Sequence, residues 1–422
     1  MLQVLYKLKT AKVFDRNRSK EDKGSTEVAD EDPFAIQIMA WCPESRMLCV
    51  AGVSANVIIY RFSKLEVTTE VVQLLEVRMQ YELNETESPD GGGGEQTSAH
   101  PTPGASPQTS GPPSHPSTSS NNSDGGNIPC LKVRSTPLKQ SPGYQVDLVV
   151  QSVWVSGEPP QQITSLALNS SYGLVVFGNS NGLAVVDYIQ KMVVLNLGTV
   201  ELYGSNDPYQ RQPRSPRKTR QPSGGLCDIN EYSATSEDRC KSPTSDHRDN
   251  SFSRSRSSSV TSIDKEAREA INSFYFCETF ARKGDCSLTP CLYVGTSLGT
   301  VLVLALTLPS AGEQRQLQPV IISPTGILVR LKGSIMRMSF LGSAGSLLPS
   351  AFEPCSQELN ESQFAVVCSE KQAKVLSLPS QTCIYKHSIT ETSFILRADV
   401  VQMNQGVCVA CFCANGHIMT LR

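Results

Sequence analysis

Two copies of the pentapeptide G-x-S-x-G, at residues 178–182 and 295–299, are the pattern most suggestive of catalysis. In serine hydrolases this pattern holds a nucleophilic serine on a strand-to-helix turn, near a histidine and a carboxylate. Here the nucleophile would be Ser180 or Ser297. Both copies, however, lie between two apolar strand patterns, and residues 52–56 form a third relative in the same place. A repeated turn explains this better than a repeated nucleophile, so we expect hairpin turns and no enzyme.

Cysteine and histidine give two further candidates for chemistry. Cys408, Cys411 and Cys413 combine C-x-x-C with C-x-C, but zinc knuckles place such pairs on tight turns and need a second pair. Residues three apart in a strand point to opposite faces, which favours buried strand cysteines. Only His387 and His417 fall in folded patterns, and His417 follows a hairpin dipeptide, which favours an exposed position. We therefore predict no metal site, and without a glycine-rich phosphate loop we predict no cofactor.

A basic run without acidic residues occupies positions 209–225. Each basic side chain near an anionic lipid surface contributes about 1 kcal/mol to membrane binding, so this run is a candidate contact for an anionic membrane surface or an acidic partner. The alternative is a solvated basic linker. The candidate residues are Arg211, Arg214, Arg217, Lys218 and Arg220.

Five serines in the same part of the chain fit protein kinase sites. Three of them follow Arg254 and Arg256, as basophilic kinases require, and two precede proline. Phosphates would offset the positive charge of the segment, although an unmodified serine-rich linker remains the alternative. The candidate phosphorylation sites are Ser257, Ser258, Ser259, Ser215 and Ser242.

The elements that must carry these residues are repeated apolar hairpins. Three clear copies cover residues 48–60, 174–186 and 292–304, and two weaker copies cover 364–378 and 407–421. A single hairpin cannot bury its own apolar face, so the copies must pack against one another. The pattern predicts an all-β, WD40-like β-propeller. Because the chain starts and stops inside strand patterns, we expect a fragment or an incomplete ring.

Two low-complexity segments interrupt the hairpins. Their composition cannot offset the entropy lost on ordering, so we predict disordered inserts. The second insert should end in a short helix over residues 262–272. The predicted organisation is propeller blades at 1–83, a Gly/Pro/Ser insert at 84–143, a blade at 144–203, a basic Ser-rich insert at 204–262, and blades at 263–422.

The charge balance and the absence of targeting signals bound the class of protein. The chain has 38 basic and 40 acidic residues, a net charge of −2, which argues against a nucleic-acid binder. There is no 18-residue apolar run and no signal peptide pattern. The fourteen cysteines lie mostly in strand patterns without the spacing of a disulfide framework, which suits a reducing cytoplasm.

Specific stretches of the chain resemble the lethal giant larvae family of WD40-like double propellers, and within it the syntaxin-binding branch. These stretches are residues 4–14 (VLYKLKTAKVF), 41–52 (WCPESRMLCVAG), 177–191 (FGNSNGLAVVDYIQK), 253–280 and 411–421. The resemblance implies a cytoplasmic protein, peripheral at the plasma membrane or secretory vesicles. It would bind syntaxin and the target-membrane SNARE complex and restrain vesicle priming and fusion in exocytosis.

We expect the chain to depart from that family in two respects, since it lacks both the first of the family's two propellers and the C-terminal helical tail. The syntaxin-binding branch ends in a vesicle-SNARE-like coiled coil, and no sustained heptad run is present in this sequence. We therefore expect this chain to supply the propeller and its regulatory loops. The alternative is a generic interaction scaffold of the lethal giant larvae type, acting in cell polarity and cortical trafficking without SNARE binding.

Overall fold

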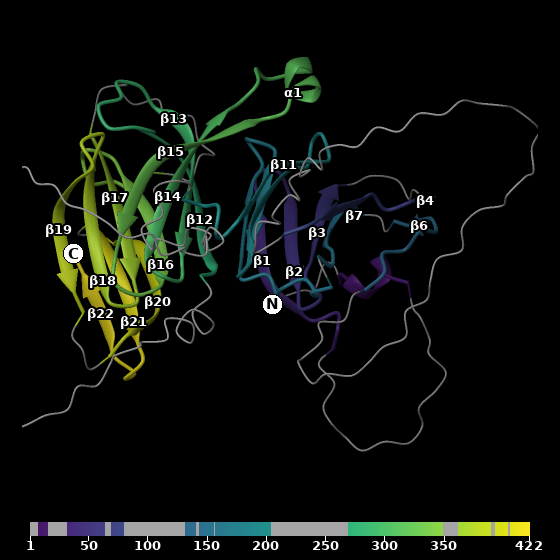
Figure 1. The fold of residues 1–422 in the computed structure, drawn as a ribbon, viewed down its shortest axis with the longest axis horizontal. Coiled ribbons are helices and arrows are strands. Elements are labelled where there is room, and N and C mark those ends of the chain that lie inside the picture. Colours follow the sequence, from purple (N-terminus) through teal and green to yellow (C-terminus); the bar gives the residue numbers. More distant parts are fainter. Residues whose placement is uncertain are drawn as a thin grey trace, which may run out of the picture. The chain divides into compact units, whose positions relative to one another are not determined.

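The computed structural model describes residues 7–15, 32–63, 69–79, 131–140, 143–155, 157–203, 269–348, 362–389, 393–403 and 406–422 (Figure 1). These residues form five sheets, a two-stranded ribbon of β4 (Thr69–Glu70) and β6 (Leu138–Lys139), the 3-10 helix η1 (Thr10–Val13) and the short helix α1 (Glu313–Leu317). Among the described residues, none of the helices has the length and hydropathy that a membrane crossing needs.

Each sheet is built mainly from strands that follow one another along the chain. The first sheet contains β1 (Ile36–Cys42), β2 (Met47–Gly52), β3 (Asn56–Ser63), β7 (Gly143–Ser152) and β5 (Leu74–Val77), in that order. The second contains β8 (Ser165–Asn169), β9 (Leu174–Gly178), β10 (Gly182–Asp187) and β11 (Met192–Gly198). The third contains β12 (Ile271–Thr279), β13 (Thr289–Thr296), β14 (Thr300–Thr307) and β15 (Ile321–Arg330).

The last two sheets continue the pattern. The fourth contains β16 (Ile335–Leu341), β17 (Gln363–Ser369), β18 (Gln372–Leu378) and β19 (Thr382–Ser388), and the fifth contains β20 (Ile395–Met403), β21 (Gly406–Cys413) and β22 (Ile418–Leu421). All pairings within the five sheets are antiparallel except that of β5 with β7. The five predicted hairpins are the second and third strands of the five sheets.

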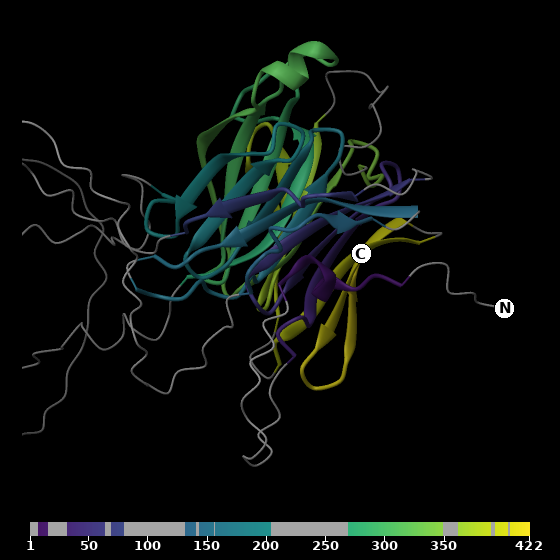
Figure 2. The same ribbon diagram turned by 90° about the vertical axis from the view of Figure 1, so that its right-hand side faces the viewer.

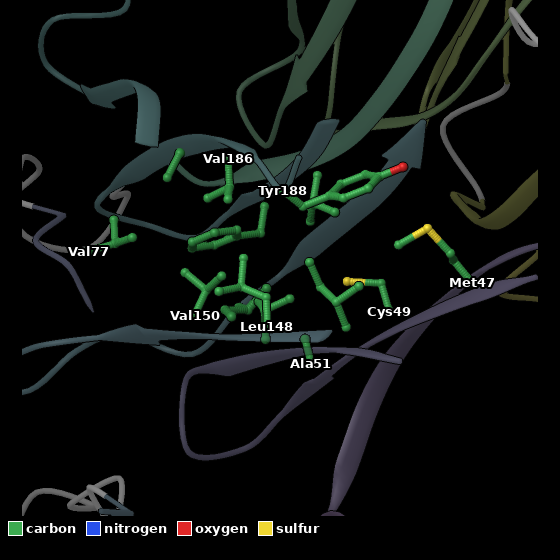
Figure 3. Close-up of a cluster of buried hydrophobic side chains, with 14 of the residues drawn as sticks. Met47, Cys49, Ala51, Val77, Leu148, Val150, Val186 and Tyr188 are labelled. Carbon is green, nitrogen blue, oxygen red and sulfur yellow. The ribbon is translucent and has the colours of Figure 1, made fainter. Parts of the chain in front are cut away.

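Consecutive sheets pack through their first strands: β1 contacts β8, β8 contacts β12, β12 contacts β16, and β16 contacts β20. Meandering sheets stacked in this way are the blades of a β-propeller, which confirms the predicted all-β fold class. The middle strands are buried on both faces because a sheet packs on each side of them, and β9 and β10 are fully buried. Figure 3 shows the core between the first and second sheets, where Leu148 and Val150 meet Val186 and Tyr188.

Three of the four junctions between sheets share one contact, which we call the isoleucine joint. The first strand of the following sheet begins with Ile271, Ile335 or Ile395, and a register shift comes directly after it. The second strand of the preceding sheet ends in small residues under that isoleucine. A Cβ atom built on Gly178 would lie only 2.6 Å from the Cβ of Ile271, and one built on Gly295 only 2.6 Å from Cγ2 of Ile335.

Backbone hydrogen bonds fix two of these joints. The Ile271 N–H donates to the Asn179 carbonyl at 3.1 Å, and the Ile395 N–H donates to the Glu370 carbonyl at 2.9 Å. The hydroxyl groups of Thr164 and Ser165 on the second sheet also donate to the Ile271 carbonyl. The joint therefore combines close packing with a short continuation of hydrogen bonding from one sheet to the next.

A buried ion pair ties the third sheet to the second. Helix α1 stands at the tip of the β14–β15 hairpin, beyond the strands (Figures 1 and 2). Its Arg315 forms an ion pair with Asp187 at 2.8 Å, and both side chains are largely or fully buried. Arg315 also donates to the Tyr172 carbonyl at 2.8 Å. Asp187 accepts two further hydrogen bonds from the backbone of the β10–β11 turn. One carboxylate therefore shapes this turn and also holds the tip of the β14–β15 hairpin, which we call the α1 arm.

Three boundaries predicted from the sequence are wrong. The first insert does not extend to 143, because residues 131–139 pack on the first sheet: Val133 and Leu138 are buried, and Phe14 pairs with Val133. The strand at 143–152 completes the first sheet rather than opening the next blade. The helix predicted over 262–272 cannot extend to its end, because β12 begins at Ile271; residues 262–268 lie outside the described residues.

Adding a methyl group at the joint should destabilise the fold. We expect Gly178→Ala and Gly295→Ala each to lower the free energy of unfolding by about 1–3 kcal/mol, because the new Cβ must displace a buried isoleucine. Gly342→Ala is the matched control, since its Cβ would meet no atom nearer than 3.5 Å. Urea unfolding followed by circular dichroism measures the difference. Equal stability of the Gly178→Ala and Gly342→Ala proteins would contradict the claim that the joint requires a residue without a Cβ atom at position 178.

The stability of the fold should depend on the ion pair between Arg315 of the α1 arm and Asp187. Arg315→Met leaves the Asp187 carboxylate buried without its cation, for which we expect a loss of about 3–5 kcal/mol in unfolding free energy. Arg61→Met is the control, because it breaks an ion pair of similar length (2.9 Å to Asp147) whose arginine side chain is 48% exposed. That loss should stay below about 1 kcal/mol. In thermal unfolding, Arg315→Met should be the less stable of the two variants. If Arg61→Met were the less stable one, the stabilising role of the Arg315–Asp187 pair would be refuted.

Candidate interaction surface

The first sheet presents an isoleucine joint that no other sheet covers. Ile36 opens β1 and is followed by the same register shift as Ile271, Ile335 and Ile395. Those three isoleucines are at most 1% exposed, whereas Ile36 is 44% exposed. Among the described residues no sheet lies against this side of β1, whereas Ile271, Ile335 and Ile395 are each covered by the sheet before them.

Two further residues on β1 occupy positions that face the preceding sheet elsewhere. Counting from the register shift, Met39 and Trp41 correspond to Met338 and Phe340 on β16. The β16 pair is buried against the third sheet, while Met39 is 67% and Trp41 53% exposed. We call Ile36, Met39 and Trp41 the β1 ridge.

The surroundings of the ridge are apolar but already folded. Trp41 packs edge-on against Phe62 with ring centroids 5.4 Å apart. The outer strands of this face are covered by Val13 and Phe14 near the N-terminus and by Val133 and Leu138. On this face of the first sheet, the ridge on β1 is exposed, while the strands further from β1 are covered.

A small hollow lies beside the ridge, between Ile36, Phe14 and Phe34 on one side and Val50 and Ile58 on the other. Its volume, about 10 Å³, is roughly the room that one water molecule requires. Its walls are mostly apolar and carry no titratable side chain. The hollow is too small to take a side chain, so a protein partner would make its contacts by packing against the exposed ridge itself.

The pentapeptides that resemble hydrolase motifs lie in hairpin turns, as predicted. Residues 178–182 join β9 to β10, and 295–299 join β13 to β14, so neither leads into a helix. The Ser297 hydroxyl accepts a hydrogen bond from the Ala270 N–H at 2.8 Å, and the Ser297 N–H donates to the Ala270 carbonyl. Ser297 therefore links its turn to the chain that enters β12.

The cysteines and histidine of the fifth sheet take the predicted positions. Cys408, Cys411 and Cys413 are all buried, and Cys411 packs on the fourth sheet while Cys408 points to the other face. His417 is exposed and lies next to the Asn415 side chain in the β21–β22 turn. Within the described residues, no cluster of three metal-ligating side chains occurs.

The ends of the second insert are held together. Tyr203 and Glu269 are both buried, and the tyrosine hydroxyl donates to the Glu269 carboxylate at 2.5 Å. The insert is thereby anchored between β11 and β12, where the second sheet gives way to the third. The five basic residues and five serines predicted as binding and phosphorylation sites lie outside the described residues, between these two anchors.

The β1 ridge was not predicted from the sequence. Its residues alternate with half-buried ones along β1, which reads like an ordinary strand with one face in the core. The signal is positional. Aligned on the register shift, the apolar residues at 39 and 41 match core positions that are buried on β16, and they are exposed because no described sheet packs on them.

Comparison with known proteins gives relatives along nearly the whole chain. A scan against protein-family models gives no match. The human LLGL scribble cell polarity complex component 2 is 25% identical over 94% of this chain and 38% of its own length. The human lethal(2) giant larvae protein homolog 1 is 23% identical over 92% of this chain and 36% of its own length. The chain thus spans less than two fifths of these relatives.

Among solved structures, the WD40 domain of SCAP from fission yeast aligns with 92% of this chain and 66% of its own chain. The sequence identity is 8% and the TM-score is 0.29. The zebrafish counterpart of LLGL component 2 is 26% identical over 62% of this chain. The sequence relatives, matched across strands from all five sheets, show that this chain is homologous to the lethal giant larvae proteins.

Proposed function

We propose that this chain is a non-enzymatic interaction scaffold in cell polarity, acting in the cytoplasm and peripherally at the cell cortex. The observation that carries the proposal is the homology over 94% of the chain to a protein named as a component of the scribble cell polarity complex. The stacked sheets supply the folded body, and the β1 ridge supplies an apolar surface for a protein partner.

The composition of the ridge supports this role. Tryptophan and methionine are enriched at the cores of protein interfaces, where large side chains fill pockets and exclude water. Trp41 is held against Phe62, so it loses little conformational freedom on binding. The exposed side chains of the ridge, Ile36 among them, can pack against apolar side chains of a partner. A surface of this kind binds by burial, with no need for a reactive group.

The binding prediction uses the two tryptophans of the chain. We expect Trp41→Ala combined with Met39→Ala to weaken binding of scribble complex components at least tenfold, about the loss of one interface hot spot. Trp154→Ala is the control, because Trp154 is similarly exposed (47%) but lies outside the ridge. Binding is measured with purified full-length chain and immobilised partners. Equal affinity of the ridge variant and wild type would remove the ridge from the proposal.

A finer function, of the tomosyn type, rests on the stretches that resemble the syntaxin-binding branch. In this second candidate the chain binds syntaxin and the target-membrane SNARE complex and restrains vesicle fusion. The same immobilised-partner assay, with syntaxin alone and in its SNARE pair, separates the two functions. Binding to polarity components without syntaxin favours the scaffold, and binding to syntaxin favours the finer function.

The second insert supplies a second contact in either case. Its basic run is proposed to meet an anionic membrane surface, and protein kinases acting on Ser257, Ser258 and Ser259, and on Ser215 and Ser242, would weaken that contact by adding negative charge. The described residues on either side of the insert, Tyr203 and Glu269, are joined by a hydrogen bond.

Vesicle binding tests this contact. Replacing the five basic residues between 209 and 225 with glutamine should abolish sedimentation of the full chain with phosphatidylserine vesicles, because each removes about 1 kcal/mol of attraction. Wild-type binding should also fall as salt rises, since exposed charges are screened. Neutral phosphatidylcholine vesicles serve as the control. Salt-independent binding that survives the substitutions would show that the insert is a linker.

A further inference from the structure

Two cysteine side chains face each other across the last joint. Cys368 on β17 and Cys411 on β21 belong to the fourth and fifth sheets, and their sulfur atoms are 3.9 Å apart. Both residues are buried, at 1% and 0% exposure. They are 43 residues apart in the chain and carry free thiols.

The packing of a joint does not itself require these thiols. Cys368 pairs with Arg337 directly after the register shift, the position that Gly295 holds on the third sheet. Cys411 pairs with Ala398 one step further, the position that Val367 holds on the fourth sheet. At the preceding joint the same two positions are therefore glycine and valine. Only between the fourth and fifth sheets do they bring two sulfur atoms together.

We propose that Cys368 and Cys411 form a reversible disulfide that fastens the fifth sheet to the fourth when a peroxide oxidises them. The sulfur atoms need to approach by less than 2 Å to reach bonding distance, about 2.05 Å. Side-chain rotation and a small shift of the fifth sheet provide that movement. The product is a covalent cross-link at one joint of the stack.

The two thiols are not equivalent in this step. Hydrogen bonding from Cys368 holds the pKa of Cys411 below its usual value, whereas the same hydrogen bond and burial raise the pKa of Cys368. The thiolate is the reactive form of cysteine. In the proposed step Cys411 is the attacking sulfur and Cys368 the resolving one, and exchanging these roles gives the same disulfide.

The reaction balances with hydrogen peroxide as the oxidant. The Cys411 thiolate attacks one peroxide oxygen, the O–O bond breaks, and the departing hydroxide takes a proton to give water, leaving a sulfenic acid. The Cys368 sulfur then attacks the Cys411 sulfur, the S–O bond breaks, and hydroxide leaves with the Cys368 proton as a second water. Two thiols lose two electrons and two protons, and one peroxide becomes two waters.

The fifth sheet is the part of the array best able to admit the oxidant. It has three strands where the second, third and fourth sheets have four. No residue of β22 is buried, and Ile418 at its start is 66% exposed. Sheets with few buried contacts open locally more often than the core, which exposes buried thiols briefly. Oxidation of the pair should thus be slower than that of the exposed Cys286 and Cys383.

The test uses the full wild-type chain treated with hydrogen peroxide, blocked with an alkylating reagent, digested and examined by mass spectrometry. We expect a peptide that links Cys368 to Cys411 and disappears after dithiothreitol. Hydrogen exchange of β20–β22 should slow by about tenfold in the oxidised protein, because the cross-link opposes local opening. Oxidation of Cys286 and Cys383 without any linked peptide would overturn the proposal, as would a linked peptide with unchanged exchange.

Two single variants separate the pair from its neighbours. Cys411→Ser should lose both the linked peptide and the oxidation-dependent protection. Cys408→Ser, which changes a buried cysteine on the other face of β21, should keep both. If Cys408→Ser also abolished the protection, the effect would belong to general oxidation and the cross-link would be refuted. Should Cys411→Ser fail to fold, the comparison of oxidised and reduced wild type still decides the outcome.

Discussion

The structure depends on the close approach of each sheet to the next at the isoleucine joint. A twisted four-stranded sheet has two apolar faces, and each must be covered by a neighbour of the same kind. At the joints below Ile271 and Ile335 that approach is possible because the chain underneath carries no Cβ atom at Gly178 and Gly295. At these two joints the glycine stands at the same place, near the end of the second strand of its sheet.

The joints also govern where the chain can vary. The second insert leaves and re-enters between β11 and β12, outside the strands that make the joint, and the Tyr203–Glu269 hydrogen bond closes its base. Helix α1 is likewise an extension of a hairpin tip, and the Arg315–Asp187 pair returns it to the neighbouring sheet. Additions are tolerated at hairpin tips and sheet connections because they do not come between the first strands.

The sequence allowed the five hairpins and the fold class to be predicted because second and third strands are apolar throughout, a signal that survives without neighbours. It did not allow β7 to be assigned to the first sheet, since about 80 residues of other chain separate it from its partner β3. Nor could it pair Arg315 with Asp187, 128 positions earlier, because nothing local marks either side chain as buried. The β1 ridge escaped prediction for a related reason: Met39 and Trp41 have core-like identities, and their exposure is set by which sheets are present.

The two ends of the stack differ from its middle in a way that bears on function. Joints inside the stack are closed by packing and, at Ile271, by backbone hydrogen bonding as well, and their isoleucines are buried. At the first sheet the same joint is open, and Ile36, Met39 and Trp41 offer its apolar half to a partner. At the last joint two thiols face each other, so that its strength can be changed by chemistry. A repeated contact that is structural in the middle of the array is, in the two proposals, a binding surface at the first sheet and a modifiable link at the last joint. The proposed interactions at both places use the same contact that builds the fold.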